Sequence, residues 1–521
     1  MATPILLLDV DVHDGSSVVT KRVGSHSWVS RPSDSPANTI WRAGLQSAGE
    51  FRRGLDLSFE GRGEQGFGYV VFSNADGEFD EWFDYGYGRS VVLRRLASKD
   101  TPLASAEVLL RAIARNVESE DAGRTVKLRL RDPLDLLKRP LQTARYAGTT
   151  TGATNTIEGD ESLIDVVKPR ALGNPNFAAP KLVNASFRTY QISTAPYLGI
   201  GVFEGGVAIP QGTNFSSVAA LHAATVAPGT CITARSLGLF RMGSTPTLPL
   251  RCQIQELGGG SLAQASRLAG RLVTEAGLTV DAASFASYLS FDGAIAGIFV
   301  DDESSYFDVI AKLLATCEGT LIPTESGTVG IARLYDPVTD SLAPASVTTF
   351  TERDISRDSD FTLLSSKVGG VDGAPAYMVT SSYLTSWDPL SESEIAGAAS
   401  ASLRGNLLNG FLAQDSVDNA ILTKHPNAPR IRFDTIVRGA SAGAAQALRR
   451  LSMLKKRRDF VSLRVPRTRA AGCLPGRTAT IRINRFGWAS AKKMLITGRT
   501  DHFASLKTQG LADMVTLEMW G

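Results

Sequence analysis

The sequence predicts a mainly β protein with some α-helix, of the α+β class and built from several domains. Segments that alternate apolar and polar side chains recur more often than helical patterns, and Gly, Pro, Asn and Asp turns separate them. The chain has 521 residues, which corresponds to about three to five domains at roughly 100–200 residues each. Its 43% hydrophobic and 21% charged residues are ordinary for globular domains, so each domain can bury a core.

Alternating segments gather toward the two ends of the chain. Between Leu6 and Val12 the apolar residues share one face, while Asp9, Asp11 and His13 share the other. Such short strands between turns are typical of antiparallel barrels or sandwiches. Further strands are expected over residues 69–73, 90–96, 125–132, 479–484 and 515–520.

Two helices are predicted in the middle of the chain. Residues 261–276 have helical spacing, and Gly277 stands at the C-cap position. Residues 305–317 form the second helix, with Ser304 or Ser305 as N-cap and with Val309 and Leu313 in its buried stripe. Residues 320–323 and 328–334 should follow it as a hairpin.

A third helix is expected over residues 442–457. Its spacing places Ala444, Leu448, Leu451 and Leu454 on the inward face.

Changes in composition divide the chain into four predicted domains. Residues 148–156 (GTTTGATNT) form a small polar stretch suited to a linker, and residues 394–402 are rich in Ala and Ser, as in a loop or a weak helix. We expect a β-rich domain over 1–147, a second over 148–255, a helix-and-hairpin domain over 256–355 and a third β-rich domain over 356–521.

Charge and hydropathy exclude some classes of protein to which this chain could belong. The net charge of +3 argues against a nucleic-acid coat that is basic throughout, and we expect no stable, specific nucleic-acid binding. No apolar run reaches the roughly 18 residues of a membrane span, and no cationic segment precedes residues 5–8 as in a signal peptide. These features predict a soluble chain that is made without export and has no membrane span.

No catalytic, cofactor-binding or metal-binding residue is predicted. The four cysteines, Cys231, Cys252, Cys317 and Cys473, lack CxxC spacing, and we expect them to be core residues. The histidines belong to no HExxH motif and to no pattern of a nucleophile beside its base. They are His13, His26, His222, His425 and His502.

Two acidic segments are candidate sites. Asp9, Asp11 and Asp14 superficially resemble a calcium loop, but Thr20 stands where an EF-hand needs Glu, so a strand that ends in a turn is the better interpretation. The densest carboxylate cluster comprises Asp76, Glu78, Asp80, Glu81 and Asp84.

The aromatic residues of that cluster favour a structural role. Phe79, Trp82 and Phe83 suggest a helical turn that docks on a sheet, and Asn74 to Gly77 is a turn signal. A glycosidase draws its two carboxylates from separate places that face each other across a cleft. Metal binding remains the main alternative for this cluster.

Basic residues concentrate near the C-terminus, above all in the run Lys455, Lys456, Arg457 and Arg458. The run follows the third predicted helix, where cations oppose the negative pole of the helix. A solvated helix end is the simplest interpretation, a contact with an acidic protein comes second, and nucleic acid comes third because no stacking aromatic residues interleave the run.

Several segments, in order along nearly the whole chain, resemble the tail hub proteins of long-tailed bacteriophages and gene-transfer particles, most closely those of alphaproteobacterial phages. At the N-terminus these are residues 31–39 (RPSDSPANT), 51–53 (FRR), 68–84 (GYVVFSNADGEFDEWFD) and 128–133 (LRLRDP). In the middle they are residues 202–215 (VFEGGVAIPQGTNF), 218–230, 238–242 and 306–334 (YFDVIAKLLATCEGTLIPTESGTVGIARL). Residues 474–476, 487–488 and 515–520 resemble the closing module.

The resemblance implies two β-barrels akin to the tail-tube subunit, one from residues 1–147 and one from about 351–521. Three chains would then offer six barrels to the sixfold tube. It also implies a non-enzymatic virion protein without a cofactor, assembled in the host cytoplasm into the tail tip or baseplate of a siphophage. Its expected partners are two further copies in a homotrimer, the distal tail protein, the tail tube, the tape-measure protein, and tail-tip, fibre or other baseplate proteins.

Two other classes stay open. One is a cell-wall-degrading tail enzyme that uses Asp80 and Glu81 of the carboxylate cluster. The other is a host-glycan-binding adhesin that uses the domain at 148–255, where aromatic residues are sparse. These are Phe187, Tyr190, Tyr197, Phe203 and Phe215.

Overall fold

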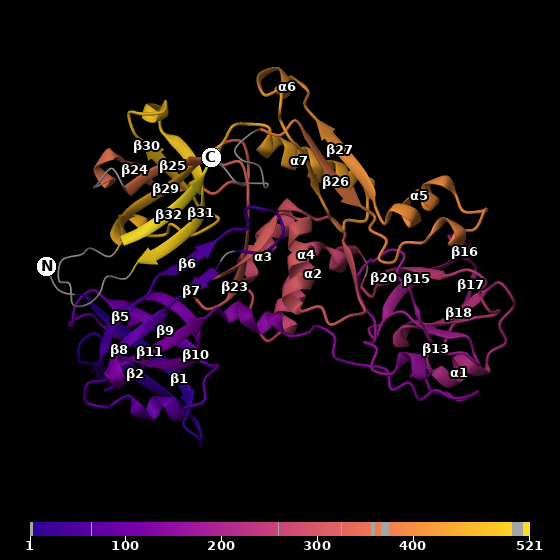
Figure 1. The fold of residues 1–521 in the computed structure, drawn as a ribbon, viewed down its shortest axis with the longest axis horizontal. Coiled ribbons are helices and arrows are strands. Elements are labelled where there is room, and N and C mark those ends of the chain that lie inside the picture. The colour runs from indigo at the N-terminus through magenta and orange to yellow at the C-terminus, as the bar shows by residue number, and fades with distance from the viewer. Residues whose placement is uncertain are drawn as a thin grey trace.

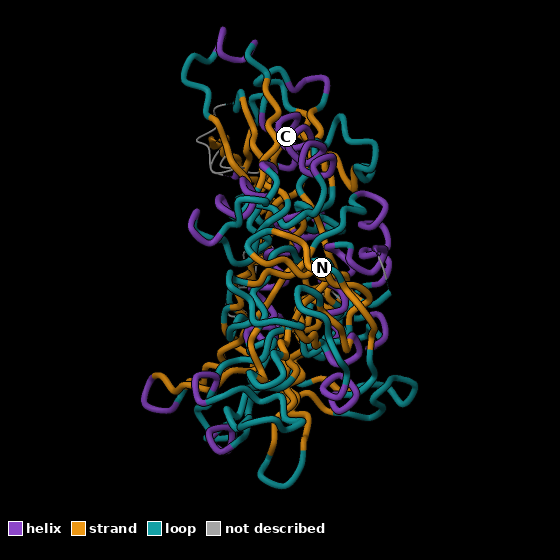
Figure 2. The backbone as a smooth tube through the Cα atoms, turned by 90° about the vertical axis from the view of Figure 1, so that its right-hand side faces the viewer, coloured by secondary structure: helices purple, strands orange, loops and turns teal. Residues whose placement is uncertain are grey.

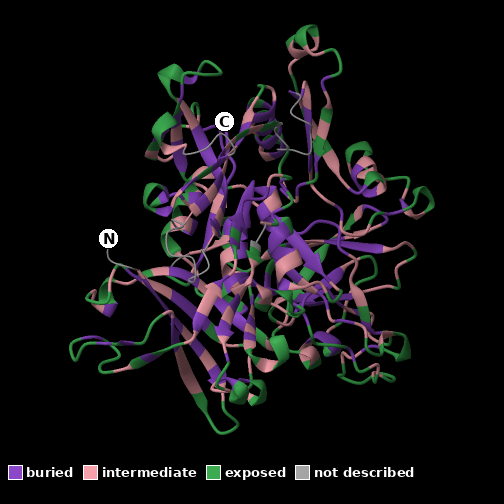
Figure 3. Cartoon of the chain, turned by 60° about the vertical axis from the view of Figure 1, so that its left-hand side comes forward, coloured by how far each residue is buried: buried purple, intermediate pink, exposed green. Residues whose placement is uncertain are grey.

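The structure, a computed structural model, describes residues 4–63, 65–258, 260–324, 326–355, 360–365, 375–502 and 514–521. It is broad and flat, as the two perpendicular views in Figure 1 and Figure 2 show. Buried stretches run along the strands and the central helices, and exposed residues concentrate in the peripheral loops (Figure 3).

The alternating segment near the N-terminus becomes the centre of a nine-stranded sheet. Leu6, Leu8 and Val10 of strand β1 face one core, while Leu7 packs with Trp41 in a second core on the opposite face. The sheet has the order β3 (Trp28–Val29), β4 (Ile40–Ala43), β2 (Val18–Gly24), β1 (Ile5–His13), β9 (Ser90–Leu96), β10 (Glu107–Glu120), β11 (Thr125–Arg131), β8 (Tyr69–Ser73) and β5 (Leu45–Ala48).

A second large sheet collects the C-terminal strands and lies beside the first (Figure 1). Its core includes Val461, Ile481, Met494 and Leu517. Its order is β24 (Ser346–Thr351), β30 (Thr478–Arg482), β31 (Lys492–His502), β32 (Met514–Trp520), β29 (Asp459–Pro466) and β25 (Phe361–Ser365), and β6 (Phe51–Gly54) with β7 (Gln65–Phe67) extends from β31.

The prediction of a mainly β, α+β protein with several domains is confirmed. The described strands of each large sheet form an open order, in which the outermost strands, β3 with β5 and β24 with β25, do not pair with each other. Barrel closure therefore stays a prediction.

The four predicted domain ranges also stay predictions. Strands β6 and β7, which come from within 1–147, pair in the sheet of the C-terminal strands.

Smaller sheets occupy the rest of the molecule. A five-stranded sheet runs β13 (Lys181–Asn184), β14 (Thr189–Gln191), β19 (Leu239–Met242), β18 (Cys231–Ala234) and β17 (Gln211–Asn214). A three-stranded sheet runs β16 (Val207–Ile209), β15 (Tyr197–Glu204) and β20 (Leu250–Glu256). Another runs β27 (Leu412–Val417), β26 (Met378–Tyr383) and β28 (Arg430–Phe433), and β12 (Arg170–Gly173) pairs with β21 (Gly297–Val300).

The predicted helices form, and the second leads into the predicted hairpin. Ser305 caps helix α4 (Tyr306–Thr316) by accepting a hydrogen bond from Asp308 N at 3.1 Å, and Gly277, with φ +90°, follows helix α2 (Ala265–Glu275). The hairpin comprises β22 (Gly319–Pro323) and β23 (Val329–Arg333). The other helices are α1 (Val218–Ala223), α3 (Ala282–Phe291), α5 (Ala401–Asn409), α6 (Ala420–Lys424) and α7 (Ala440–Leu454).

The predicted inward face of α7 is wrong at two positions. Leu448 is 62% exposed and Ala444 is exposed, whereas Leu451 and Leu454 are buried as expected. The buried face instead includes the polar residues Gln446 and Arg450. They turn inward because backbone carbonyls at the end of α4 accept their hydrogen bonds, at 2.6 Å to Thr316 O and 2.7 Å to Ala315 O.

Candidate functional site

The carboxylate cluster forms a short 3-10 turn on the N-terminal sheet. Phe79 and Trp82 are buried, and their rings lie 5.2 and 5.1 Å from that of Phe72 on β8. This confirms the predicted docking on a sheet. Phe83 was expected to dock with them, but it is 45% exposed because the tight turn points it away from the sheet.

The carboxylates of this turn bond to neighbouring groups. Glu81 forms an ion pair with Lys21 at 2.9 Å, Glu78 pairs with Arg42, and Asp80 accepts a hydrogen bond from the Asn74 amide at 2.7 Å. These contacts hold the turn against β2, β4 and Asn74, the residue that follows β8, and each carboxylate has a different partner. This arrangement differs from that of two carboxylates that face one another across a sugar.

The other acidic candidates from the sequence, Asp9 and Asp14, make contacts that stabilise the fold. Asp9 accepts a hydrogen bond from Trp41 Nε1 at 2.7 Å, and Asp14 caps a turn, where the backbone N–H of Ser17 and the hydroxyl of Ser16 lower its pKa to about 2. Among the described residues, no group of three or more His, Cys, Asp or Glu side chains is placed to hold a metal ion, and no helix could span a membrane.

All four cysteines are buried, as predicted. Burial raises the pKa of the Cys231 and Cys473 thiols to about 11, and raises the pKa of the Cys252 and Cys317 thiols as well. A thiol with a raised pKa is a weak nucleophile at neutral pH.

His222 is part of the core of the five-stranded sheet. Its ring stacks on Phe187 at 4.1 Å, and its two nitrogens lie 3.0 Å from Thr189 Oγ1 and 3.1 Å from Asn155 Oδ1. Burial, with a smaller effect from Arg241, lowers the pKa of this imidazole and favours its neutral form.

The basic run stands at the end of α7, as expected, and carboxylates of the same chain face it. Lys455 forms an ion pair with Asp418 at 3.0 Å. Asp336 forms ion pairs with Arg458 at 2.6 Å and with Lys456 at 3.4 Å. Arg458 also lies over the Trp520 ring, 5.0 Å from its centre. Burial opposes ionisation of Asp336, but hydrogen bonds from Arg458 and from backbone N–H groups prevail and lower its pKa.

Strand β6, which follows β5 of the N-terminal sheet in the sequence, pairs with β31 of the C-terminal sheet and forms a joint between the two parts of the chain, with Arg53 opposite Arg499 and Phe51 opposite Asp501. Asp501 is 1% exposed and accepts from Arg499 and Arg467, each at 2.9 Å. Residues about 450 positions apart in the sequence thus meet around one buried carboxylate.

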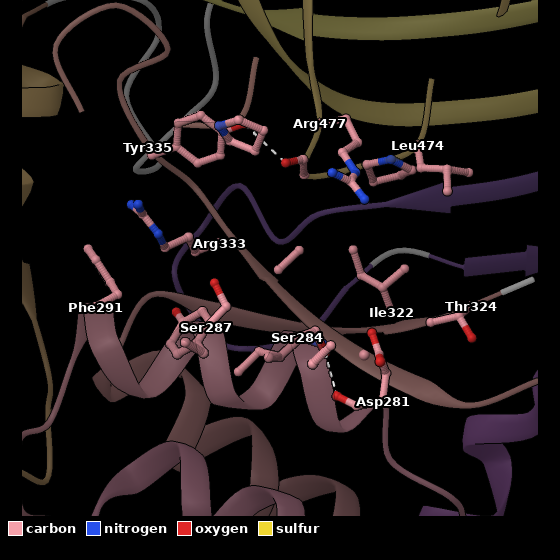
Figure 4. A pocket seen from close by; sticks show the side chains of 18 of the residues that line it. Asp281, Ser284, Ser287, Phe291, Ile322, Thr324, Arg333, Tyr335, Leu474 and Arg477 are labelled. Carbon is pink, nitrogen blue, oxygen red and sulfur yellow. Dashed lines mark hydrogen bonds between the residues drawn. The ribbon is translucent and has the colours of Figure 1, made fainter. Parts of the chain in front are cut away.

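Beside this joint lies a cavity of about 420 Å³ (Figure 4). Helix α3, the β22–β23 hairpin, residues 342–344, the 474–477 loop and β6 line it. Tyr335 braces one wall, since its hydroxyl lies 3.0 Å from Gly476 O and 2.9 Å from Thr478 Oγ1. Ser284 braces another, because it accepts from Ile331 N at 3.2 Å and donates to Asp281 O at 2.9 Å.

The charged residues that line this cavity are mostly basic. Its described lining has a single carboxylate, Asp281, three arginines, Arg53, Arg333 and Arg477, and neither a His nor a Cys. Arg53 and Arg333 lie in two of the hub-like segments, 51–53 and 306–334, but no spacing pattern in the sequence marks these four residues as a site, because the cavity is assembled from distant segments.

Comparisons with known proteins give distant structural likenesses. No model of a known protein family matches the chain, and no curated protein does. The chain is similar to a tail protein from Neisseria meningitidis MC58, with 10% identity, 99% of this chain and 96% of that chain covered, and a TM-score of 0.41.

Two further solved structures resemble the chain to about the same degree. A 43 kDa tail protein of prophage MuSo2 from Shewanella oneidensis has 8% identity, with 99% of this chain and 98% of that chain covered and a TM-score of 0.41. A chain of the virion of a native gene transfer agent particle has 11% identity, with 74% and 90% covered and a TM-score of 0.40. These structural neighbours are tail and virion proteins.

Proposed function

We propose that the chain is a structural virion protein, the hub at the distal end of a bacteriophage tail tube. In this role it caps the tube, holds tail-tip, fibre or other baseplate proteins, and bounds the channel through which the tape-measure protein and DNA leave. It acts mechanically, without a cofactor, in the tail tip or baseplate of a phage with a non-contractile tail, and is assembled in the host cytoplasm.

The observation that carries the proposal is the ordered series of hub-like segments along nearly the whole sequence, from residues 31–39 to 515–520. The arrangement of the two large sheets supports it. One sheet is built from the N-terminal part of the chain and one mainly from the C-terminal part, and β6 of the N-terminal part adds to the second sheet by pairing with β31.

A homotrimer follows from the symmetry of the tube. If each large sheet corresponds to one tube-like barrel, three chains present six such units and match a sixfold ring. Neighbouring units would then cover the outermost strands of these sheets, which removes exposed edges that invite aggregation.

In a hub, we expect the basic run Lys455–Arg458 to lie outside the channel. Lysines and arginines that line the bore would retain DNA through its phosphates. Lys455, Lys456 and Arg458 have carboxylate partners within the chain, so less of their charge is available to a polyanion. A structure of the assembled tail in which this run lines the bore would contradict the proposal.

The test is the mass of the purified full-length chain in solution, with class averages from electron microscopy of the same sample. A trimeric ring with a central opening supports the hub. A monomer that also fails to form a threefold ring on purified tail tubes rejects it.

Cleavage assays on peptidoglycan and polysaccharide test the enzyme alternative. We expect no cleavage by the wild-type chain. Cleavage that Asp80→Asn and Glu81→Gln abolish would reject the non-enzymatic role.

A further inference from the structure

The cavity at the joint has room for a ligand. Its volume of about 420 Å³ falls within the roughly 300–1,000 Å³ of ligand pockets, which often lie where domains meet. Much of its wall is apolar, with Phe291, Ile322, Leu342, Leu474 and Pro475 among the lining residues. Such a wall favours an apolar group in the interior.

Arg477 supplies the charge that such a ligand would meet. Figure 4 shows its side chain pointing into the cavity from the 474–477 loop. Arg477 is exposed, and its guanidinium makes no ion pair or hydrogen bond with the residues that the structure describes. Arg333 of the same lining differs, because it pairs with Asp340 at 2.7 Å and stacks on Phe291 at 3.8 Å. Arg53 differs as well, since Asp501 lies 3.8 Å from it.

Asp281 limits the kind of anion that can bind. It stands at the N-cap position of α3, yet its side chain accepts no capping hydrogen bond. Of the four charged residues of the described lining, Arg53 and Arg333 face Asp501 and Asp340 of the same chain, which leaves Arg477 and Asp281 to meet a ligand. One carboxylate beside Arg477 is therefore favourable, whereas a chain of phosphates would also meet Asp281 and be repelled.

We propose that this cavity binds an extended peptide segment of a partner protein, with one acidic side chain on Arg477 and a neighbouring apolar side chain in the interior. A guanidinium can hold a carboxylate through two parallel hydrogen bonds. The exposed Ser287 of α3 lies on the same wall and offers a hydroxyl to the peptide backbone. This inference does not depend on the hub function, since the purified chain alone tests it.

The experiment is a calorimetric titration of the full-length chain with two neutral-ended peptides. The probe is acetyl-Ala-Leu-Glu-Leu-Ala-amide, and its twin carries Gln in place of Glu. We expect saturable binding of the Glu peptide and roughly tenfold weaker binding of the Gln peptide, as for the loss of one charged hydrogen-bond pair. Equal affinity for the two peptides, or no binding of the Glu peptide at millimolar concentration, would overturn the proposal.

Three variants locate the site. Arg477→Gln should remove the difference between the two peptides, and Ser287→Trp, which fills the cavity from an exposed position, should abolish binding of both. The matched control is Arg482→Gln, an exposed arginine of β30 that does not line the cavity, and it should bind as the wild type does. Unchanged discrimination in Arg477→Gln would overturn the assignment.

Two competitors separate the peptide from other sources of negative charge. Neither hexanoate nor a twelve-residue oligothymidine should displace the Glu peptide at equal concentration. If hexanoate binds as tightly as the peptide, the site takes small carboxylates. If the oligonucleotide does so, the site is a general anion site. Either result rejects a peptide site.

Discussion

Helices α4 and α7 are neighbours in the fold but bury faces of different chemistry. The buried face of α4 is almost entirely apolar, with Val309, Ile310, Leu313 and Leu314 among its residues. The buried face of α7 includes Gln446 and Arg450, and Arg450 is fully enclosed. The buried faces of the two helices therefore differ in composition, although apolar residues recur at helical spacing in both.

The C-terminus of α4 explains the difference. The last carbonyls of a helix have no partner within it and need donors from elsewhere. At α4 the carbonyls of Ala315 and Thr316 receive them from Arg450 and Gln446. The next residue but one, Glu318, is buried and lies 3.4 Å from Arg450 Nε. Helix α7 therefore buries polar groups because it caps another helix.

Replacement of Arg450 by methionine should have the largest effect. It leaves the Ala315 carbonyl without this donor. It also removes the guanidinium that lies beside Glu318 and 4.6 Å from the centre of the Phe433 ring, so that only Arg449 of the two arginines stays beside Glu318. We expect local stability to fall by about 4 kcal/mol, as when one partner of a buried ion pair is lost. Hydrogen–deuterium exchange of peptides from α7 measures it.

The control for this substitution is Arg457→Met, just beyond the same helix, where the side chain is 78% exposed. Its effect should stay below about 1 kcal/mol. Equal effects of the two substitutions would show that capping of α4 does not stabilise α7.

In α4 the corresponding test is Leu313→Ala. Leu313 is completely buried in the core formed with α2 and α3. The cavity should cost about 3 kcal/mol, seen as faster exchange of peptides from α4. An effect below about 1 kcal/mol would mean that this apolar face is loosely packed, contrary to its burial.

Gln446→Leu should have a smaller effect than either. The leucine fills similar space but leaves the buried Thr316 carbonyl without its 2.6 Å hydrogen bond. We expect a loss of about 1–3 kcal/mol, because an unsatisfied buried acceptor keeps its desolvation cost. Gln446→Glu should not rescue the loss, since a carboxylate cannot donate to a carbonyl. Exchange in the peptide that contains Thr316 measures both variants.

This contrast also shows how far the sequence could predict the molecule. The strictly alternating segment 125–132 forms β11 and buries Val126, Leu128 and Leu130, because alternation reports burial directly. The apolar run 69–73 and the loosely alternating segment 90–96 form β8 and β9 with the expected bounds. The Ser305 cap was predictable because it depends on residues three apart. The face of α7 was not, since apolar periodicity cannot register that Gln446 and Arg450 have distant backbone partners.

The candidate cavity could not be predicted from the sequence, for the same reason. Its four charged residues, Arg53, Asp281, Arg333 and Arg477, come from four separate segments, and only the pairing of β6 with β31 and the packing of α3 on the hairpin bring them together. The short segment 51–54 has no alternating pattern that could indicate this pairing.

The smallest effect should come from Leu448→Gln, which tests the other side of the comparison. The sequence placed Leu448 in the core of α7, whereas the structure leaves it 62% exposed. A buried leucine replaced by a polar residue costs several kcal/mol, but an exposed one changes stability by less than about 0.5 kcal/mol. Exchange in the α7 peptides should therefore match that of the wild type. A loss comparable to that of Leu313→Ala would place Leu448 in a core, and the periodicity rather than the capping of α4 would then define the face of α7.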